Sequence, residues 1–280
     1  MAVNEIIQHH KDKSLQTGLY GSDSGKLNKK KKNYKNLFEK STEKIFLLSS
    51  LISIVSLIAI TVFIFSRGSA IFFKVGFSQI IFGMEWKPLE GLYGIFPMIV
   101  ASIIVTLATT FVAVLIGLMT AVLLAEISPP VFSKVIRPAV DLLAAIPSVV
   151  YGFFGLIVIV PLIDRKFGGG GNSLLAAIVI LSIMILPTIV SISETSIRAV
   201  PIEYKEGSLA LGASHIETIF KVILPAAKSG IFASIVLAMG RAIGETMAVM
   251  LVIGNTPQIP HSLFDRARTL TSNIAIEMSY

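Results

Sequence analysis

The chain has 280 residues, of which 54% are hydrophobic and only 15% are charged, and its mean hydropathy is +0.79. These values exclude an ordinary soluble domain and predict a membrane protein. The absence of cysteine excludes disulfide frameworks, zinc ribbons and thiol catalysis, and the four scattered histidines argue against a metal site.

The net charge of +7 comes mainly from residues 1–44, which carry ten lysines against five acidic residues. This segment has no apolar run and no cleavage site, so we interpret it as a weakly ordered tail rather than a signal peptide. Lysine-rich segments beside a membrane span favour the cytoplasmic side. The tail is therefore predicted to be cytoplasmic, with contact to anionic membrane lipid as the alternative, and nucleic-acid binding is not expected.

Residues 45–280 are predicted to form an all-α transmembrane domain, because they contain five apolar stretches suited to a hydrocarbon core of about 30 Å. The stretches are 45–66, 91–125, 142–163, 174–192 and 231–254. The second would make a helix of about 50 Å, so part of it should project or begin as a surface segment. The predicted outer segments are 67–94, 164–171 and 255–280, and Lys134 and Arg137 mark a short cytoplasmic loop.

Pro147, Gly152 and Pro187 lie inside the third and fourth stretches. Proline and glycine break the helical hydrogen-bond ladder and are tolerated in lipid only where neighbours or water satisfy the freed carbonyls. The glycine run 168–171 lacks the Lys-Ser/Thr that follows in a phosphate-binding P-loop, so a flexible loop is expected there.

Residues 201–225 separate the fourth and fifth stretches and carry a different pattern. Apolar residues at helical spacing predict a short amphipathic helix from Ile202 to about Leu211. Gly212 can end that helix with a positive φ, and Pro225 can occupy the first turn of the next one. The segment would then be a rigid projection that binds a soluble partner in the cytoplasm. The alternative is an amphipathic connector lying on the bilayer.

This segment resembles the cytoplasmic coupling loop of ABC importer permeases, whose pattern is E-A-A-x3-G-x9-I-x-L-P. The residues at the pattern positions are Glu206, Gly207, Ser208, Gly212, Val222, Leu224 and Pro225. Gly207 and Ser208 replace the two alanines, and Val222 replaces the isoleucine. The resemblance implies that the residues which couple the chain to an ATPase are Glu206, Gly207, Ser208, Gly212, Leu224 and Pro225. It also implies a type I importer bundle of six spans, so the sixth is expected to be missing here.

The fifth stretch contains Arg241 and Glu245 between Gly240 and Gly244. An arginine near the centre of a membrane helix costs on the order of 3 kcal/mol, so it should have a partner or a function. In a continuous helix Glu245 would lie on the same face and could pair with Arg241, while the two glycines would allow another helix to approach. A structural ion pair and a switchable anion site in a substrate pathway are both open at this point.

Three segments, 143–156, 240–255 and 262–278, resemble phosphate-importer permeases of the PstC type. The resemblance implies a subunit that imports inorganic phosphate across the cytoplasmic membrane. It also implies a second, similar permease subunit, a cytoplasmic ATPase dimer and an external phosphate-binding protein. The chain has no Walker motif, so it is not expected to be an enzyme or to bind a cofactor; ATP and Mg²⁺ would belong to the partner ATPase.

Other functions remain open from the residues alone. A permease for another oxyanion, such as molybdate or sulfate, would share these motifs. An ion-coupled secondary carrier would also use an intramembrane arginine and glutamate, but it would not need the coupling pattern, and no inverted repeat is visible. A membrane enzyme has the least support, because no nucleophile–base pair or metal cluster stands out.

Overall fold

The computed structural model describes residues 39–40 and 42–278, and it divides into two compact units, Met1–Lys74 and Val75–Tyr280. Most of the predicted tail 1–44 therefore lies outside the described residues. The first predicted span forms part of a longer helix, Thr42–Val75. The large apolar side chains along it are exposed, as expected of a helix that contacts lipid or another subunit.

The second unit begins with a small structured segment where the sequence predicted an outer loop. Its elements are α2 (Phe77–Phe82), β1 (Trp86–Lys87), η1 (Pro88–Glu90) and β2 (Leu92–Tyr93). The strands pair antiparallel, with Trp86 opposite Tyr93. Gly83 and Gly94 allow the two backbones at the base of this hairpin to lie close together. A Cβ added to Gly83 would lie only 2.7 Å from the Gly94 Cα. Residues 67–94, predicted as an outer loop, are therefore mostly helix and hairpin, and their place outside the membrane stays a prediction.

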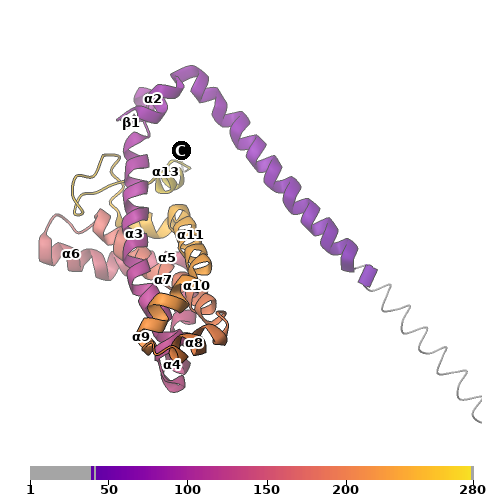
Figure 1. Cartoon of the computed structure of the whole chain (residues 1–280). Coiled ribbons are helices and arrows are strands. Elements are labelled where there is room, and N and C mark those ends of the chain that lie inside the picture. The colour runs from indigo at the N-terminus through magenta and orange to yellow at the C-terminus, as the bar shows by residue number, and fades with distance from the viewer. Residues whose placement is uncertain (1–38, 41, 279–280) are drawn as a thin grey trace, which may run out of the picture. The chain divides into compact units, whose positions relative to one another are not determined.

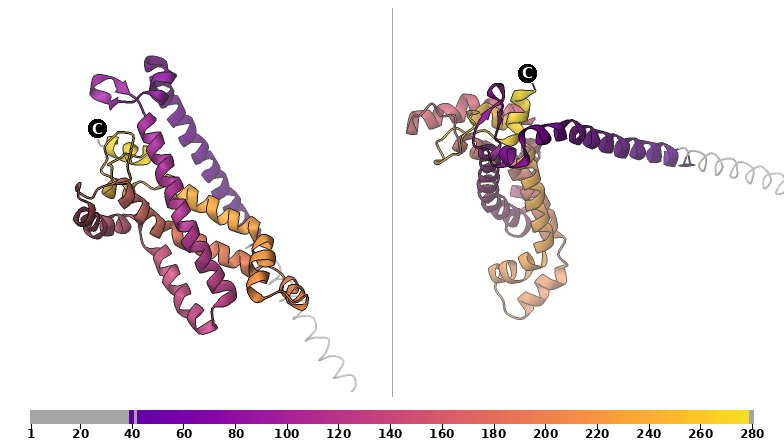
Figure 2. Two further views of the ribbon diagram at one scale, coloured as in Figure 1. Left: turned by 60° about the vertical axis from the view of Figure 1, so that its left-hand side comes forward. Right: turned by 90° about the horizontal axis from the view of Figure 1, so that it is seen from above.

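The core of the second unit is built from three long helices (Figure 1). They are α3 (Phe96–Val122), α7 (Leu174–Arg198) and α11 (Lys228–Gly244). α3 continues through the π-helical turn η2 (Leu123–Ile127), and it runs from the end that carries β1 to the end that carries α4, α8 and α9 (Figures 1 and 2). Buried hydroxyls reinforce the apolar packing, since Ser193 and Ser234 share a hydrogen bond of 2.9 Å. The surface start predicted for the second span is present as β2.

The predicted third span is divided at Pro147. The elements here are α4 (Pro130–Ala145), α5 (Ser148–Phe154), η3 (Gly155–Ile159) and α6 (Val160–Phe167). The span is Ser148–Phe167 rather than 142–163, and the expected short loop around Lys134 is a 16-residue helix. Gly152 stays helical; a Cβ there would lie 2.9 Å from the Ala248 Cα, so this glycine allows a close helix crossing.

The predicted continuous span 231–254 is also wrong, because the helix breaks after Gly244. The elements after α7 are α8 (Ile202–Ala210), α9 (His215–Thr218), η4 (Ile219–Ile223), α10 (Leu224–Ala226), α11, α12 (Met247–Val252) and α13 (Leu270–Glu277). Four helices among the described residues are long and apolar enough to cross a membrane, or five if His215–Ala226 and Lys228–Gly244, bent by 68°, count as one span. The predicted all-α membrane bundle is confirmed.

The segment after α12 folds back against the rest of the unit. Arg268 anchors it: Nε donates to the Asn255 carbonyl at 2.8 Å, and Nη1 donates to Asn273 Oδ1 at 3.0 Å. Glu277 lies 3.4 Å from the same guanidinium and accepts a hydrogen bond from the Trp86 indole at 3.1 Å. The polar segment 255–278 is therefore tied to the β1–β2 hairpin.

Candidate coupling loop and membrane arginine

The first part of the candidate loop is α8, whose bounds match the predicted helix within one residue; no residue of α8 is buried, so the predicted amphipathic face is not packed against the second unit. Glu206 and Gly207 are exposed, and Ser208 is half-buried with its hydroxyl 3.0 Å from the Thr218 hydroxyl. A Cβ added to Gly207 would have no atom within 4 Å, so glycine in place of the alanine leaves no packing defect. α8 thus presents Glu206 to its surroundings.

Gly212 ends α8 as predicted, with φ +86° and its N–H donating to the Leu209 carbonyl at 3.0 Å. A residue with a Cβ would be strained in this conformation. Ser214 then caps α9 in a capping box, in which its hydroxyl accepts from the Glu217 N–H and the Glu217 carboxylate accepts from the Ser214 N–H. Two short helices joined by a fixed turn form a rigid unit.

Pro225 lies in the first turn of α10, but α9, η4 and α10 form one continuous helical segment that ends at Ala226. The chain bends at Ala227 and α11 starts at Lys228, so Pro225 marks the end of the loop rather than the first turn of the membrane helix. Ile219, Ile223 and Ala227 pack with residues of α3 and α7, and this apolar cluster fastens the second half of the loop to the core.

Glu126 in η2 lies beside both short helices of the loop. Its carboxylate is 2.6 Å from Lys205 Nζ of α8 and 4.0 Å from His215 Nε2 of α9. Only 10% of the Glu126 side chain and 27% of the Lys205 side chain are exposed. This ion pair is therefore largely removed from solvent.

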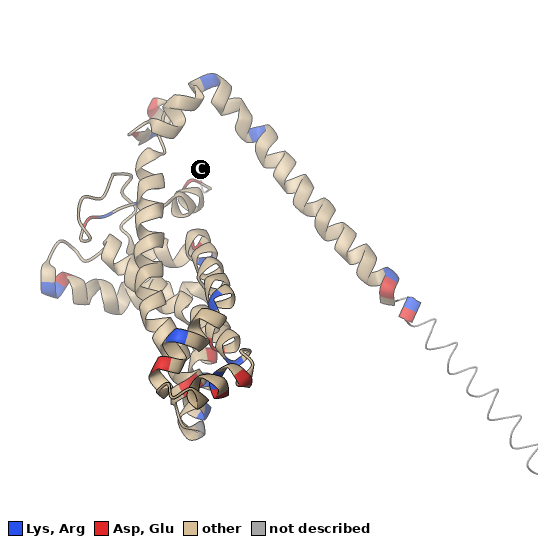
Figure 3. Ribbon diagram, in the orientation of Figure 1, with Lys and Arg blue, Asp and Glu red and all other residues tan. Residues whose placement is uncertain are grey.

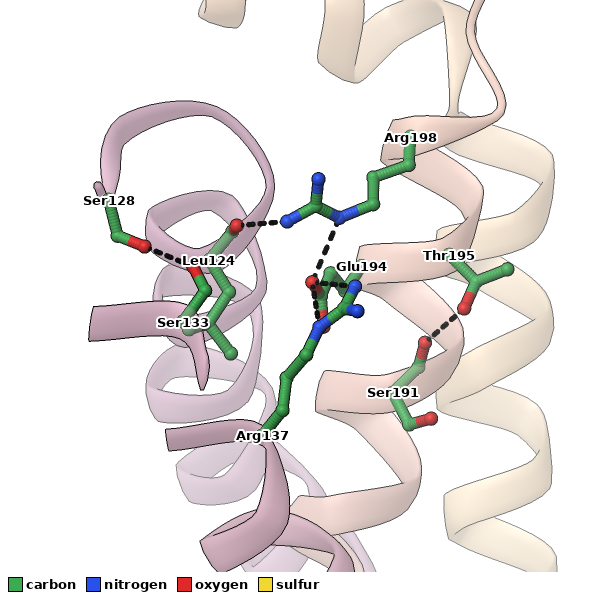
Figure 4. A network of polar contacts seen from close by, with 8 residues as sticks. All are labelled: Leu124, Ser128, Ser133, Arg137, Ser191, Glu194, Thr195 and Arg198. Atoms are coloured by element: carbon green, nitrogen blue, oxygen red, sulfur yellow. Dashed lines mark hydrogen bonds and ion pairs between the residues drawn. The ribbon is translucent and has the colours of Figure 1, made fainter. Parts of the chain in front are cut away.

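A second cluster surrounds Glu194 of α7, which is only 5% exposed (Figure 4). Arg137 of α4 donates to its Oε1 from Nε at 2.8 Å and also from Nη2. Arg198 donates to the same oxygen from Nε at 2.9 Å, and its Nη2 reaches the Leu124 carbonyl of η2 at 2.5 Å. The hydrogen bonds that Arg137 donates to Glu194 raise the pKa of Arg137. The cluster joins α4, α7 and η2.

Charged residues of the second unit gather over α4, α8 and α9, as Figure 3 shows. We call the part of the unit formed by 123–137 and 194–226 the loop end. Within the part of the chain that the structure describes, no group of three His, Asp or Glu side chains has the arrangement of a metal site. The buried acids of the loop end instead join helices through ion pairs.

Arg241 and Glu245 are not joined by an ion pair among the described residues, which corrects the expectation of a pair on one helical face. α11 ends at Gly244, and Glu245 has an extended backbone with ψ 128°. Its carboxylate instead accepts from the Ala248 N–H at 3.1 Å, at the start of α12, and its carbonyl accepts from the Thr271 hydroxyl at 2.8 Å. Glu245 stabilises the helix break.

Arg241 remains in α11 with its side chain exposed. It lies 13 residues after Lys228, which corresponds to about 20 Å along the helix. A Cβ added to Gly240 or to Gly244 would have no atom within 4 Å, so this face of α11 is not covered by the second unit.

Glu126 and Glu194 are functional candidates that the sequence alone does not predict. A weak signal existed for Glu194, because it is an acid two residues after an apolar stretch and Arg198 follows four residues later. The partner of Glu126 lies 79 residues away and the α4 partner of Glu194 lies 57 residues away. Such pairings depend on the fold.

Residues 113–276, more than half of the chain, match the family described as binding-protein-dependent transport system inner membrane component. The chain is 44% identical over 236 residues to a probable ABC transporter permease protein, YqgH, of Bacillus subtilis (strain 168), covering 82% of this chain and 76% of that protein. It is 35% identical to the phosphate transport system permease protein PstC of Pasteurella multocida (strain Pm70), covering 74% and 71%.

Among solved structures, the chain is similar to one of the MetNI methionine ABC transporter in an inward-facing conformation. The TM-score is 0.53 and the identity 23%, over 70% of this chain and 84% of that chain. This similarity supports the fold alone. Membrane components of the matched family work with an ATPase and a binding protein. The chain belongs to the family of binding-protein-dependent transport system inner membrane components: it is a multi-pass inner-membrane permease subunit of an ABC transporter, performs no catalysis itself and binds no cofactor.

Proposed function

We propose that this permease subunit imports inorganic phosphate and is driven by ATP hydrolysis on a separate ATPase dimer. The substrate assignment rests on Arg241, a planar cation far along an apolar helix, and on the similarity to phosphate transport system permease proteins. A guanidinium can donate two parallel hydrogen bonds to phosphate oxygens, which makes arginine well suited to an oxyanion. An external phosphate-binding protein would deliver the substrate.

The proposed ATPase contact is the exposed face of α8 and the turn that follows. Glu206 and Gly207 are exposed, Ser208 holds α8 to Thr218, and Gly212 fixes the turn. Leu224 and Pro225 end the loop before the bend into α11. This assignment places 201–225 and the tail 1–44 in the cytoplasm, with 164–171 outside, and treats 45–280 as the permease domain.

The exposed face of α11 supports a pathway shared with a second, similar permease subunit. Arg241 is exposed beside Gly240 and Gly244, which have open space on the helix surface. A bare arginine facing lipid at this depth would be costly. A second subunit packed near the two glycines would enclose Arg241 in a polar route for the anion. Glu245, at the helix break, would lie on the same route.

The test is a panel of oxyanions with the full complex in proteoliposomes, comprising both permease subunits, the ATPase dimer and the binding protein. Phosphate should stimulate ATP hydrolysis and accumulate in the vesicle lumen, whereas sulfate and molybdate should do neither. Stimulation and uptake with sulfate or molybdate, but not with phosphate, would overturn the substrate assignment. Uptake of any oxyanion without ATP would contradict the ATP-driven mechanism.

A further inference from the structure

The two halves of the loop 201–225 are attached to the core in different ways. η4 packs through buried Ile219 and Ile223 against α3 and α7. α8, in contrast, has no buried residue. Its side-chain contacts include the Ser208–Thr218 hydrogen bond within the loop and the Lys205–Glu126 ion pair to η2. The ion pair is thus the direct polar link between α8 and the end of α3.

The π-helical turn that carries Glu126 also carries the next link. The Leu124 carbonyl, two residues earlier, accepts from Arg198, which binds Glu194 and through it Arg137 of α4 (Figure 4). A chain of polar contacts therefore runs from α8 through η2 to α7 and α4. π-Helical turns inside α-helices are uncommon and are often found at functional sites.

Two cavities lie along this chain of contacts. One of about 400 Å³ lies beside Glu126, Arg198 and Lys205, and one of about 210 Å³ lies beside Arg137 and Glu194. Residues of two buried apolar clusters line these cavities without filling them, so the helices there are joined by polar contacts as well as by apolar packing.

We propose that Glu126 is a positioning residue that transmits movement of α8, through η2, to α7 and α4. This inference rests on the proposed coupling of the loop to the ATPase. The carboxylate holds Lys205 of α8 and lies near His215 of α9, so a displacement of the loop displaces η2 with it. Loss of the link leaves ATP hydrolysis intact but separates it from movement of the membrane helices.

The first test is the ratio of anions imported per ATP hydrolysed by the reconstituted complex, measured with whichever oxyanion the wild type carries. Glu126→Gln keeps the shape of the side chain and should lower this ratio at least fivefold, with unchanged complex yield. Lys221→Met is the matched control, since it removes an exposed lysine from the same loop, 74% exposed and paired with Glu217. The control should keep the wild-type ratio.

The second test restores the link covalently. The chain has no cysteine, so Glu126→Cys with Lys205→Cys, assembled with cysteine-free partner subunits, introduces two unique thiols. The ratio should be low before treatment and should recover after a short, reducible bis-thiosulfonate joins the thiols. An unchanged ratio in Glu126→Gln, or no recovery after cross-linking, would overturn the inference. A wild-type complex that carries an oxyanion other than phosphate would overturn the proposed substrate. The test of Glu126 would still hold, because the ratio of anions imported per ATP hydrolysed is measured with the oxyanion that the wild type carries.

Discussion

The loop end and the break between α11 and α12 use charged residues in opposite ways. At the loop end the largely buried acids Glu126 and Glu194 are paired with cations from the same chain. At the helix break Arg241 is exposed and has no ion pair among the described residues, while Glu245 stabilises α12 instead. The two buried acids of the loop end are paired within this chain, whereas Arg241 of α11 is exposed without an ion pair among the described residues.

This difference separates structural charge from functional charge. A paired, buried glutamate fixes the arrangement of helices, because removal of its partners leaves it uncompensated. Arg241 is exposed and has no ion pair among the described residues, and we propose that a ligand or a partner subunit contacts it instead. The predictions that follow perturb each region in turn.

The strongest perturbation of the loop end is Gly212→Pro. Proline requires φ near −65° and has no N–H, whereas Gly212 has φ +86° and donates to the Leu209 carbonyl. We expect ATP-driven uptake to fall to background while the subunit still inserts and assembles. Uptake at the wild-type rate, measured with equal amounts of assembled complex, would show that the turn is not needed for coupling.

The paired cluster can be broken by replacing both Arg137 and Arg198 with Met, which leaves Glu194 buried without a cation. Loss of the partners of a buried charge costs about 3 kcal/mol or more. We expect a lower folded yield and a lower thermal midpoint in detergent. Both can be measured by size-exclusion chromatography, before and after heating. Adding Glu194→Met to this double variant should recover much of the loss; if the triple variant is less stable than the double, Glu194 is not the source.

The helix break can be tested with Glu245→Ala and Glu245→Gln as a matched pair. The Glu245 side chain accepts from the Ala248 N–H, and loss of such a cap costs about 1 kcal/mol. Thermal unfolding should show the loss for alanine and much less of it for glutamine, which keeps an acceptor oxygen. Equal destabilisation by both would indicate that the charge, rather than the cap, stabilises this position.

The smallest expected effect is that of Gly207→Ala. The position is helical and an added Cβ meets no atom within 4 Å, so alanine should stabilise α8 by up to about 1 kcal/mol. Uptake should stay within twofold of wild type, since alanine is the residue of the coupling-loop pattern. A large fall in uptake would mean that the ATPase contacts this surface closely enough to exclude one methyl group.

Local patterns predicted the parts of the fold that local physics controls. The bounds of α8 and the positive φ of Gly212 follow from helical periodicity and from the freedom of glycine. The third span was placed too early because Pro147 was read as an internal proline, whereas it separates α4 from α5. The break at Glu245 has no proline to mark it and depends on Thr271, which is 26 residues away.

Among the candidate site residues, Arg241 was identifiable because a charge in an apolar stretch is conspicuous. The spacing to Glu245 suggested a pair, but i,i+4 proximity holds only in an unbroken helix. Glu126 and Glu194 could not be predicted in this way, because an acidic residue just after an apolar stretch is common where a membrane helix ends. The fold brings α8 and α9 to Glu126, and it brings α4 to Glu194 of α7.

The most direct test of the account is ATP-driven phosphate uptake by Arg241→Lys in the complete reconstituted complex, at matched assembly. Lysine keeps the charge but lacks the planar fork of arginine. We predict at least a tenfold loss of uptake with an unchanged thermal midpoint, because Arg241 has no ion pair to lose within the described part of the chain. Wild-type uptake by Arg241→Lys, and also by Arg241→Leu, would contradict a role for this residue in moving the anion.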